Sequence, residues 1–114
     1  MILELITDNR IRIQENVPIQ IRILGGITPN SIEVYEIIND QEFLTNYKYP
    51  GTIPLNDIIS LNLNITGSPR TIVYRIKVTD KNNQYAKTVE DKNYVEVTID
   101  FKEIEINNLN ISDI

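Results

Sequence analysis

Two side chains that carry out most chemistry at neutral pH are missing from this sequence. It has no cysteine and no histidine, so it offers no thiolate, no disulfide and no imidazole for catalysis. Carboxylates are the reactive groups that remain, and four of them gather in one stretch: Glu33, Glu36, Asp40 and Glu42. Two carboxylates about 5–9 Å apart across a cleft could hydrolyse a glycoside. Nothing here indicates a cleft, and no tryptophan is present to stack on a sugar. We therefore interpret the cluster as solvated charges at a sheet edge and expect no enzymatic activity.

Two polar runs, 80–83 and 90–93, carry oxygen ligands at loop spacing. Calcium takes six to eight oxygen ligands, often from Asp and Asn in turns. The same residues are ordinary turn formers, because they tolerate left-handed backbone and accept hydrogen bonds from their own loop. We favour turns and expect no metal or other cofactor. A weak calcium site at Asp80, Asn82 and Asn83 stays open as the alternative.

Five tyrosines could form a recognition surface, as tyrosines do at many interfaces: Tyr35, Tyr47, Tyr49, Tyr85 and Tyr94. The best pair is Tyr47 and Tyr49, which flank Lys48 in a proline-glycine turn. The alternative is that these rings cover the loop ends of the core. Tyr47, Lys48 and Tyr49 are the candidate interaction residues of this turn.

The element that must position these loops is a strand over 71–80. Ile72, Tyr74, Ile76 and Val78 fall on one face and Arg75, Lys77 and other residues on the opposite face, which is the period of two that a pleated strand imposes. The 22 isoleucines favour the same reading, because β-branched side chains suit pleated, half-buried surfaces.

Similar alternation predicts further strands along the chain. A first strand over 2–14 is broken at Asp8 and Asn9, and others cover 17–24, 32–40, 58–65 and 95–101. Phe43 and Leu44 are expected to continue as a short edge strand. In 32–40 the apolar row contains Glu36, for which we expect a bulge near Tyr35–Glu36 or an edge position. The alternative, which we rank behind these, is that a partner covers this strand. An extra ribbon over 85–89 is a further possibility. The spacing predicts an all-β fold, an antiparallel sandwich of about seven strands.

The run from 59 to 80 resembles the E–F portion of immunoglobulin-like and fibronectin type III-like modules. The matching residues are an apolar strand ending at Ile65, then Gly67 and Pro69 in a turn, then Tyr74, Ile76 and Val78. The resemblance implies an Ig-like sandwich in which Tyr74 forms a tyrosine corner, its hydroxyl bonding back to the turn. Ile76 would occupy the place of the second cysteine of antibody domains. On this basis Tyr74→Phe would cost roughly 1–3 kcal/mol.

The charge and hydropathy of the chain disfavour several classes of binding partner. The net charge is −5 and the basic residues are scattered, which disfavours nucleic acid and anionic membranes. No stretch approaches the roughly 20 apolar residues of a membrane span, and the first residues do not resemble a secretion signal. If Met1 is the native start, we expect assembly in a host cytoplasm. We expect a protein assembly as partner, not a small-molecule ligand.

We divide the chain into an Ig-like sandwich over 1–101 and a C-terminal extension over 102–114. The extension keeps regularly spaced apolar residues that could contact a neighbour: Ile104, Ile106, Leu109 and Ile111. The expected function is that of a non-enzymatic structural accessory protein. It resembles the auxiliary proteins that decorate tailed-phage capsids, fibres and tails, and we expect it in the virion. The alternative is an excised ligand- or glycan-binding Ig-like module of a bacterial surface protein.

Overall fold

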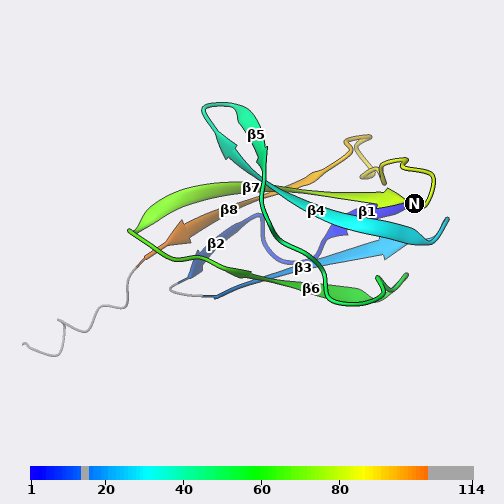
Figure 1. The fold of residues 1–114 in the computed structure, drawn as a ribbon, viewed down its shortest axis with the longest axis horizontal. Coiled ribbons are helices and arrows are strands. Elements are labelled where there is room, and N and C mark those ends of the chain that lie inside the picture. The colour runs from blue at the N-terminus through cyan, green and yellow to red at the C-terminus, as the bar shows by residue number, and fades with distance from the viewer. Residues whose placement is uncertain (14–15, 103–114) are drawn as a thin grey trace, which may run out of the picture.

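The computed structural model describes residues 1–13 and 16–102, and these form a sandwich of two β-sheets without a helix (Figure 1). One sheet has three strands in the order β1-β3-β6, and the other has five in the order β2-β8-β7-β4-β5. The strands are β1 (Ile2–Leu5), β2 (Arg10–Ile13), β3 (Asn16–Leu24), β4 (Pro29–Ile38), β5 (Gln41–Leu44), β6 (Ile58–Asn64), β7 (Arg70–Asp80) and β8 (Val95–Phe101). The predicted all-β sandwich is confirmed.

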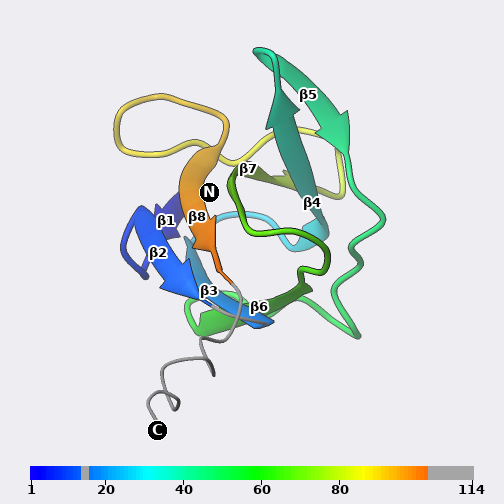
Figure 2. The same cartoon turned by 90° about the vertical axis from the view of Figure 1, so that its left-hand side faces the viewer.

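Alternation along the strands builds the core between the sheets (Figure 2). In β7, which lies between β8 and β4, the inward residues Ile72, Tyr74, Ile76 and Val78 are all buried. The facing sheet contributes the inward residues of β3 and β6, among them Ile19, Ile21 and Leu61, each fully buried. The 71–80 stretch is therefore the central strand that the sequence predicts.

The break at Asp8 and Asn9 sends the N-terminal segment from one sheet to the other. β1 pairs antiparallel with β3, whereas β2 pairs parallel with β8. The hydrogen bond from the Thr98 N–H to the Asn9 carbonyl, 2.8 Å long, fixes the point of entry into the second sheet. This exchange joins the two sheets along one side of the sandwich.

The predicted bulge near Tyr35–Glu36 is wrong. β4 pairs with β7 in regular register from Ser31 to Ile37, and the one irregularity lies between Pro29 and Ser31. The carboxylate of Glu36 is tolerated in the apolar row because burial decreases along it: Ile32 and Val34 are buried, Glu36 is intermediate and Ile38 is exposed. The row thus leaves the core as β4 extends outward.

The possible ribbon over 85–89 is not a strand. Within the described residues, this segment makes only isolated bridges, from Tyr85 to Thr79 and from Lys87 to Ile2. The chain between β5 and β6 also has no strand, and it crosses from one sheet to the other with Ile53 buried.

Across the described part of the chain, no helix is long and apolar enough to cross a membrane.

Candidate functional site

The β4–β5 hairpin extends beyond the body of the sandwich (Figures 1 and 2). Its two-residue turn consists of Asn39 and Asp40, both at positive φ (51° and 64°). Two left-handed residues between paired Ile38 and Gln41 make a type I′ turn, whose twist matches that of the flanking strands. Asn and Asp adopt this backbone more readily than other side chains, so the local sequence specifies the hairpin.

The outer strand of this hairpin, β5, is the edge of the five-stranded sheet. All four of its residues are exposed, and among the described residues it pairs with β4 alone. Three large apolar side chains lie open on the hairpin: Ile38, Phe43 and Leu44 are 45%, 48% and 61% exposed. An unpaired edge with apolar side chains and no lysine or proline is a template for pairing with another strand.

The four clustered carboxylates of the sequence, Glu33, Glu36, Asp40 and Glu42, have different neighbours in the structure. Glu42 accepts hydrogen bonds from Lys77 at 2.7 Å and from Arg75 at 3.0 Å, and these bonds, that from Lys77 above all, lower its pKa. Glu33 accepts a bond from the Tyr35 hydroxyl. Glu36 is in register with Tyr74, and Asp40 lies in the turn. A general acid needs a raised pKa, whereas the lowered pKa of Glu42 favours the ionised carboxylate.

The tyrosines separate into two groups. Lys77 lies over Tyr35 at 4.6 Å and over Tyr85 at 5.6 Å, and Arg75 lies over Tyr94 at 4.5 Å from the ring centre. These three rings therefore share the outer face of the five-stranded sheet with cations of β7. Desolvation and the bond to Glu33 strongly raise the pKa of Tyr35.

Tyr47 and Tyr49 lie elsewhere, in the segment that crosses between the sheets. Both are half-buried and pack against the core, whereas Lys48 between them is exposed. Burial raises the pKa of the Tyr47 hydroxyl. The core-covering alternative thus describes the two rings, and Lys48 alone is freely presented.

Tyr74 is buried as expected, at 8% exposure, but the bond predicted for its hydroxyl is absent from the hydrogen bonds of the described residues. Arg70 makes the side-chain bonds to the turn instead: its guanidinium donates to the carbonyls of Thr66 and Ser68, both at 2.9 Å. Desolvation raises the pKa of the Tyr74 hydroxyl. Pro69 is exposed in the same turn, and Ile76 is fully buried in the core. Nothing in the sequence pattern pointed to Arg70.

The Asp80 carboxylate serves its own loop. It is 5% exposed, and its Oδ1 accepts the N–H groups of Asn82 at 2.7 Å and Gln84 at 3.0 Å. Asn83 adopts the left-handed backbone of a turn residue. Residues 1–13 and 16–102 bring together no three carboxylate or imidazole groups around a possible metal position. The turn-forming role thus accounts for the geometry of this loop.

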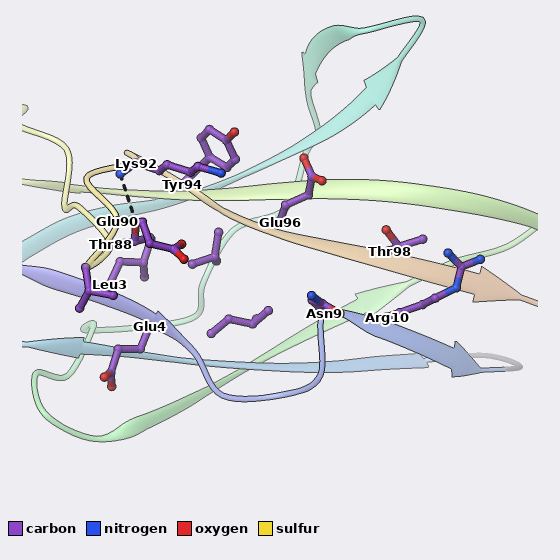
Figure 3. A pocket seen from close by; sticks show the side chains of 13 residues that line it. Leu3, Glu4, Asn9, Arg10, Thr88, Glu90, Lys92, Tyr94, Glu96 and Thr98 are labelled. Atoms are coloured by element: carbon purple, nitrogen blue, oxygen red, sulfur yellow. Dashed lines mark hydrogen bonds between the residues drawn. The ribbon is translucent and has the colours of Figure 1, made fainter.

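An open groove of about 650 Å³ lies where β1 and β2 separate beside β8 (Figure 3). Arg10 and Asn9 border it at the start of β2, and Tyr94, Glu96 and Thr98 border it along β8. One sequence feature coincides with it, the break at Asp8 and Asn9, because the groove opens where the chain changes sheets. Arg10 is held by two bonds to Asp100, at 2.8 and 2.9 Å.

A scan of protein-family models and a search of curated protein sequences gave no match for this chain. Function must therefore be inferred from its surface. The predicted contact residues Ile104, Ile106, Leu109 and Ile111 lie outside the described residues.

Proposed function

We propose that this protein is a non-enzymatic structural accessory subunit that acts through protein–protein contacts. The observation that carries the proposal is the β4–β5 hairpin, an extended edge with Ile38, Phe43 and Leu44 exposed. Monomeric proteins usually protect such edges with charges, proline or a covering loop. β5 has no proline, and its one charge, Glu42, is paired with Lys77 and Arg75 of β7. Exposed apolar side chains grouped on one projecting element indicate an interaction site more strongly than scattered ones.

The strand order supports the immunoglobulin-like reading of the module. Taking β3, β4, β6, β7 and β8 as strands B, C, E, F and G places B beside E in one sheet and C, F and G together in the other. That is the arrangement of the immunoglobulin sandwich. Such folds carry many functions, so the role of the protein rests on its surface.

The setting we propose is a virion, with assembly in the host cytoplasm. Its support is the low reactive-residue content and the composition of the chain, with 22 isoleucines and 14 asparagines, typical of AT-rich coding. The test is to purify virus particles and large complexes from the source and to count copies of this chain by mass spectrometry. We expect a stoichiometric copy number that follows the symmetry of the assembly.

A matched pair of variants connects that test to the hairpin. Phe43→Lys places a charge on the exposed edge, and Ile27→Lys does so at a similarly exposed apolar residue, 41% against 48%, in the loop before β4. Incorporation should fall for Phe43→Lys and persist for Ile27→Lys. Equal incorporation of both variants, or a chain found only free of any assembly, would contradict the proposal.

The groove beside β8 favours a second candidate, binding of a polar ligand such as a glycan. Asn9, Tyr94 and Glu96 line this recess. Arg75 already lies 4.5 Å from the centre of the Tyr94 ring and donates to Glu96 at 2.9 Å, so a sugar would compete with that cation. Titration of the isolated protein against a glycan array, with Tyr94→Ala as the variant, tests this candidate. Saturable binding by a monomer that Tyr94→Ala abolishes would favour it over the structural role.

A further inference from the structure

We propose that the partner of the β5 edge is a second copy of this chain, paired antiparallel so that Phe43 lies opposite Phe43 of the second copy. This inference rests on the proposed function, because it assigns a partner to the same hairpin. It joins two five-stranded sheets into one continuous sheet.

The backbone of β5 is suited to this register. The Thr45 N–H donates to the Val34 carbonyl at 2.9 Å, so the odd-numbered residues of this segment direct their polar groups toward β4. In an antiparallel ladder these directions alternate. The N–H and C=O groups of Glu42 and Leu44 therefore point to the free side. A two-fold axis through Phe43 places Glu42 of each copy opposite Leu44 of the other, and each such pair exchanges two hydrogen bonds.

The side chains of β5 also fit those of the second copy across this axis. Phe43 lies on the sheet face of Glu36, its partner in β4, and would meet its own copy in a close, non-hydrogen-bonded pair. Aromatic pairs opposite one another stabilise antiparallel strands. Phe43 is 48% exposed in the single chain, so the pairing covers apolar surface that is otherwise in water.

Charge excludes the register in which Glu42 lies opposite its own copy. Glu42 is the one charged residue of β5, and its carboxylate is held by Lys77 and Arg75 of its own chain. The two-fold axis through Phe43 places Glu42 opposite leucine, not opposite a second carboxylate, and like charges directly opposite would be destabilising. Because β5 has only four residues, we expect a weak dimer whose population depends on protein concentration.

The absence of cysteine from the sequence allows a direct test of register. Residues in a non-hydrogen-bonded pair have Cα atoms about 4.5 Å apart, within the range that a disulfide spans. Phe43→Cys should therefore form a cross-linked dimer in a glutathione redox buffer. Leu44→Cys places the two thiols two positions out of register, roughly 8 Å apart, beyond the usual limit. Ile27→Cys, remote from β5 along the chain, measures random collision.

The expected result is cross-linking of Phe43→Cys at least ten-fold faster than of Leu44→Cys or Ile27→Cys. Equal rates for all three, or a faster rate for Leu44→Cys, would overturn the proposed pairing. Because Phe43→Cys also removes a ring, sedimentation equilibrium of the unsubstituted full chain provides the second measurement. We expect concentration-dependent dimers that Phe43→Lys weakens at least ten-fold and Ile27→Lys leaves unchanged.

The two proposals fail in different ways. A full chain that stays monomeric at millimolar concentration overturns the self-pairing. If Phe43→Lys still prevents incorporation into a purified assembly, the structural role stands with another partner for the hairpin. A chain that dimerises through Phe43 and yet is found in no assembly supports the pairing and contradicts the structural role.

Discussion

Lys77 illustrates how single residues hold the outer face of the five-stranded sheet. Its side chain is 13% exposed, its ammonium is 2.7 Å from Glu42, and it lies over Tyr35 and Tyr85. The charge is thus compensated on several sides, which a long cation needs when it is largely removed from water. Glu42 connects this centre to Arg75 and so ties β5 to β7. The edge strand is held in place by these ionic contacts in addition to its ladder.

Tyr74→Phe should change the free energy of unfolding by less than about 1 kcal/mol, because among the described residues no hydrogen bond of the Tyr74 hydroxyl is lost. Tyr74→Ala is the matched variant, and removal of the buried ring should cost roughly 3–5 kcal/mol. Urea denaturation measures both. A loss of 1–3 kcal/mol for Tyr74→Phe would instead support the tyrosine corner expected from the sequence.

Glu42→Gln should make stability less dependent on acid pH. The pKa of Glu42 lies below its ordinary value of 4.5 in the folded chain, so its ionic contribution is complete above that pH and is lost as pH falls through the lower, folded-state pKa. At pH 7 the substitution should cost about 0.5–1 kcal/mol. Urea midpoints between pH 7 and 3 provide the measurement, with Glu90→Gln as control. Parallel profiles for Glu42→Gln and the unsubstituted chain would contradict this role.

At the scale of elements, the hairpin and the N-terminal segment have opposite effects on the sheet edges. The change of sheet after β1 lets β2 pair with part of β8 and become the opposite edge of the five-stranded sheet, where Arg10 and Arg12 are exposed. The type I′ turn instead carries β5 outward, where among the described residues no strand covers it. The two sides of the five-stranded sheet thus differ, and the β5 side is the one suited to an added strand.

Asp40→Val should destabilise the hairpin by about 1–2 kcal/mol, because a β-branched residue is strained at the positive φ of this position. Asp40→Gly accepts the same backbone without that cost and should be neutral or slightly stabilising. Hydrogen exchange of the Phe43 amide, which faces β4, reports the opening of the hairpin. Equal protection in the two variants would mean that the turn does not control the edge.

At the scale of the whole molecule, the core and the interaction sites occupy different regions. Within the described residues, the buried apolar side chains lie between the two sheets. The exposed Ile38, Phe43 and Leu44 belong to the β4–β5 hairpin, which extends past the three-stranded sheet. Substitutions at the edge should therefore affect association more than folding. That separation makes the hairpin accessible to mutational tests.

Removal of residues 103–114 should leave the free energy of unfolding within about 1 kcal/mol, because the last few residues of a domain usually contribute little to its stability. If Ile104, Ile106, Leu109 and Ile111 contact a neighbour, the shortened chain should lose most of its incorporation into the assembly. Thermal unfolding and the copy number in purified particles give the two measurements. Full incorporation of the shortened chain would rule out the predicted contact.

The sequence by itself determined most of the strands and their buried faces, because the period of two is a local property of extended backbone. It did not settle the path of residues 85–89 or the pairing around Glu36. The buried rows of β7 and β8 and the edge position of Phe43 and Leu44 were all readable in this way. Tertiary structure alone decided which sheet each strand joins, how far the hairpin extends and where the groove opens. The ion pair of Glu42 with Lys77 joins residues 35 positions apart, and no local sequence pattern indicates that they meet. The bonds from Arg70 to the carbonyls of Thr66 and Ser68 are local, but they depend on where the folded turn directs those carbonyls.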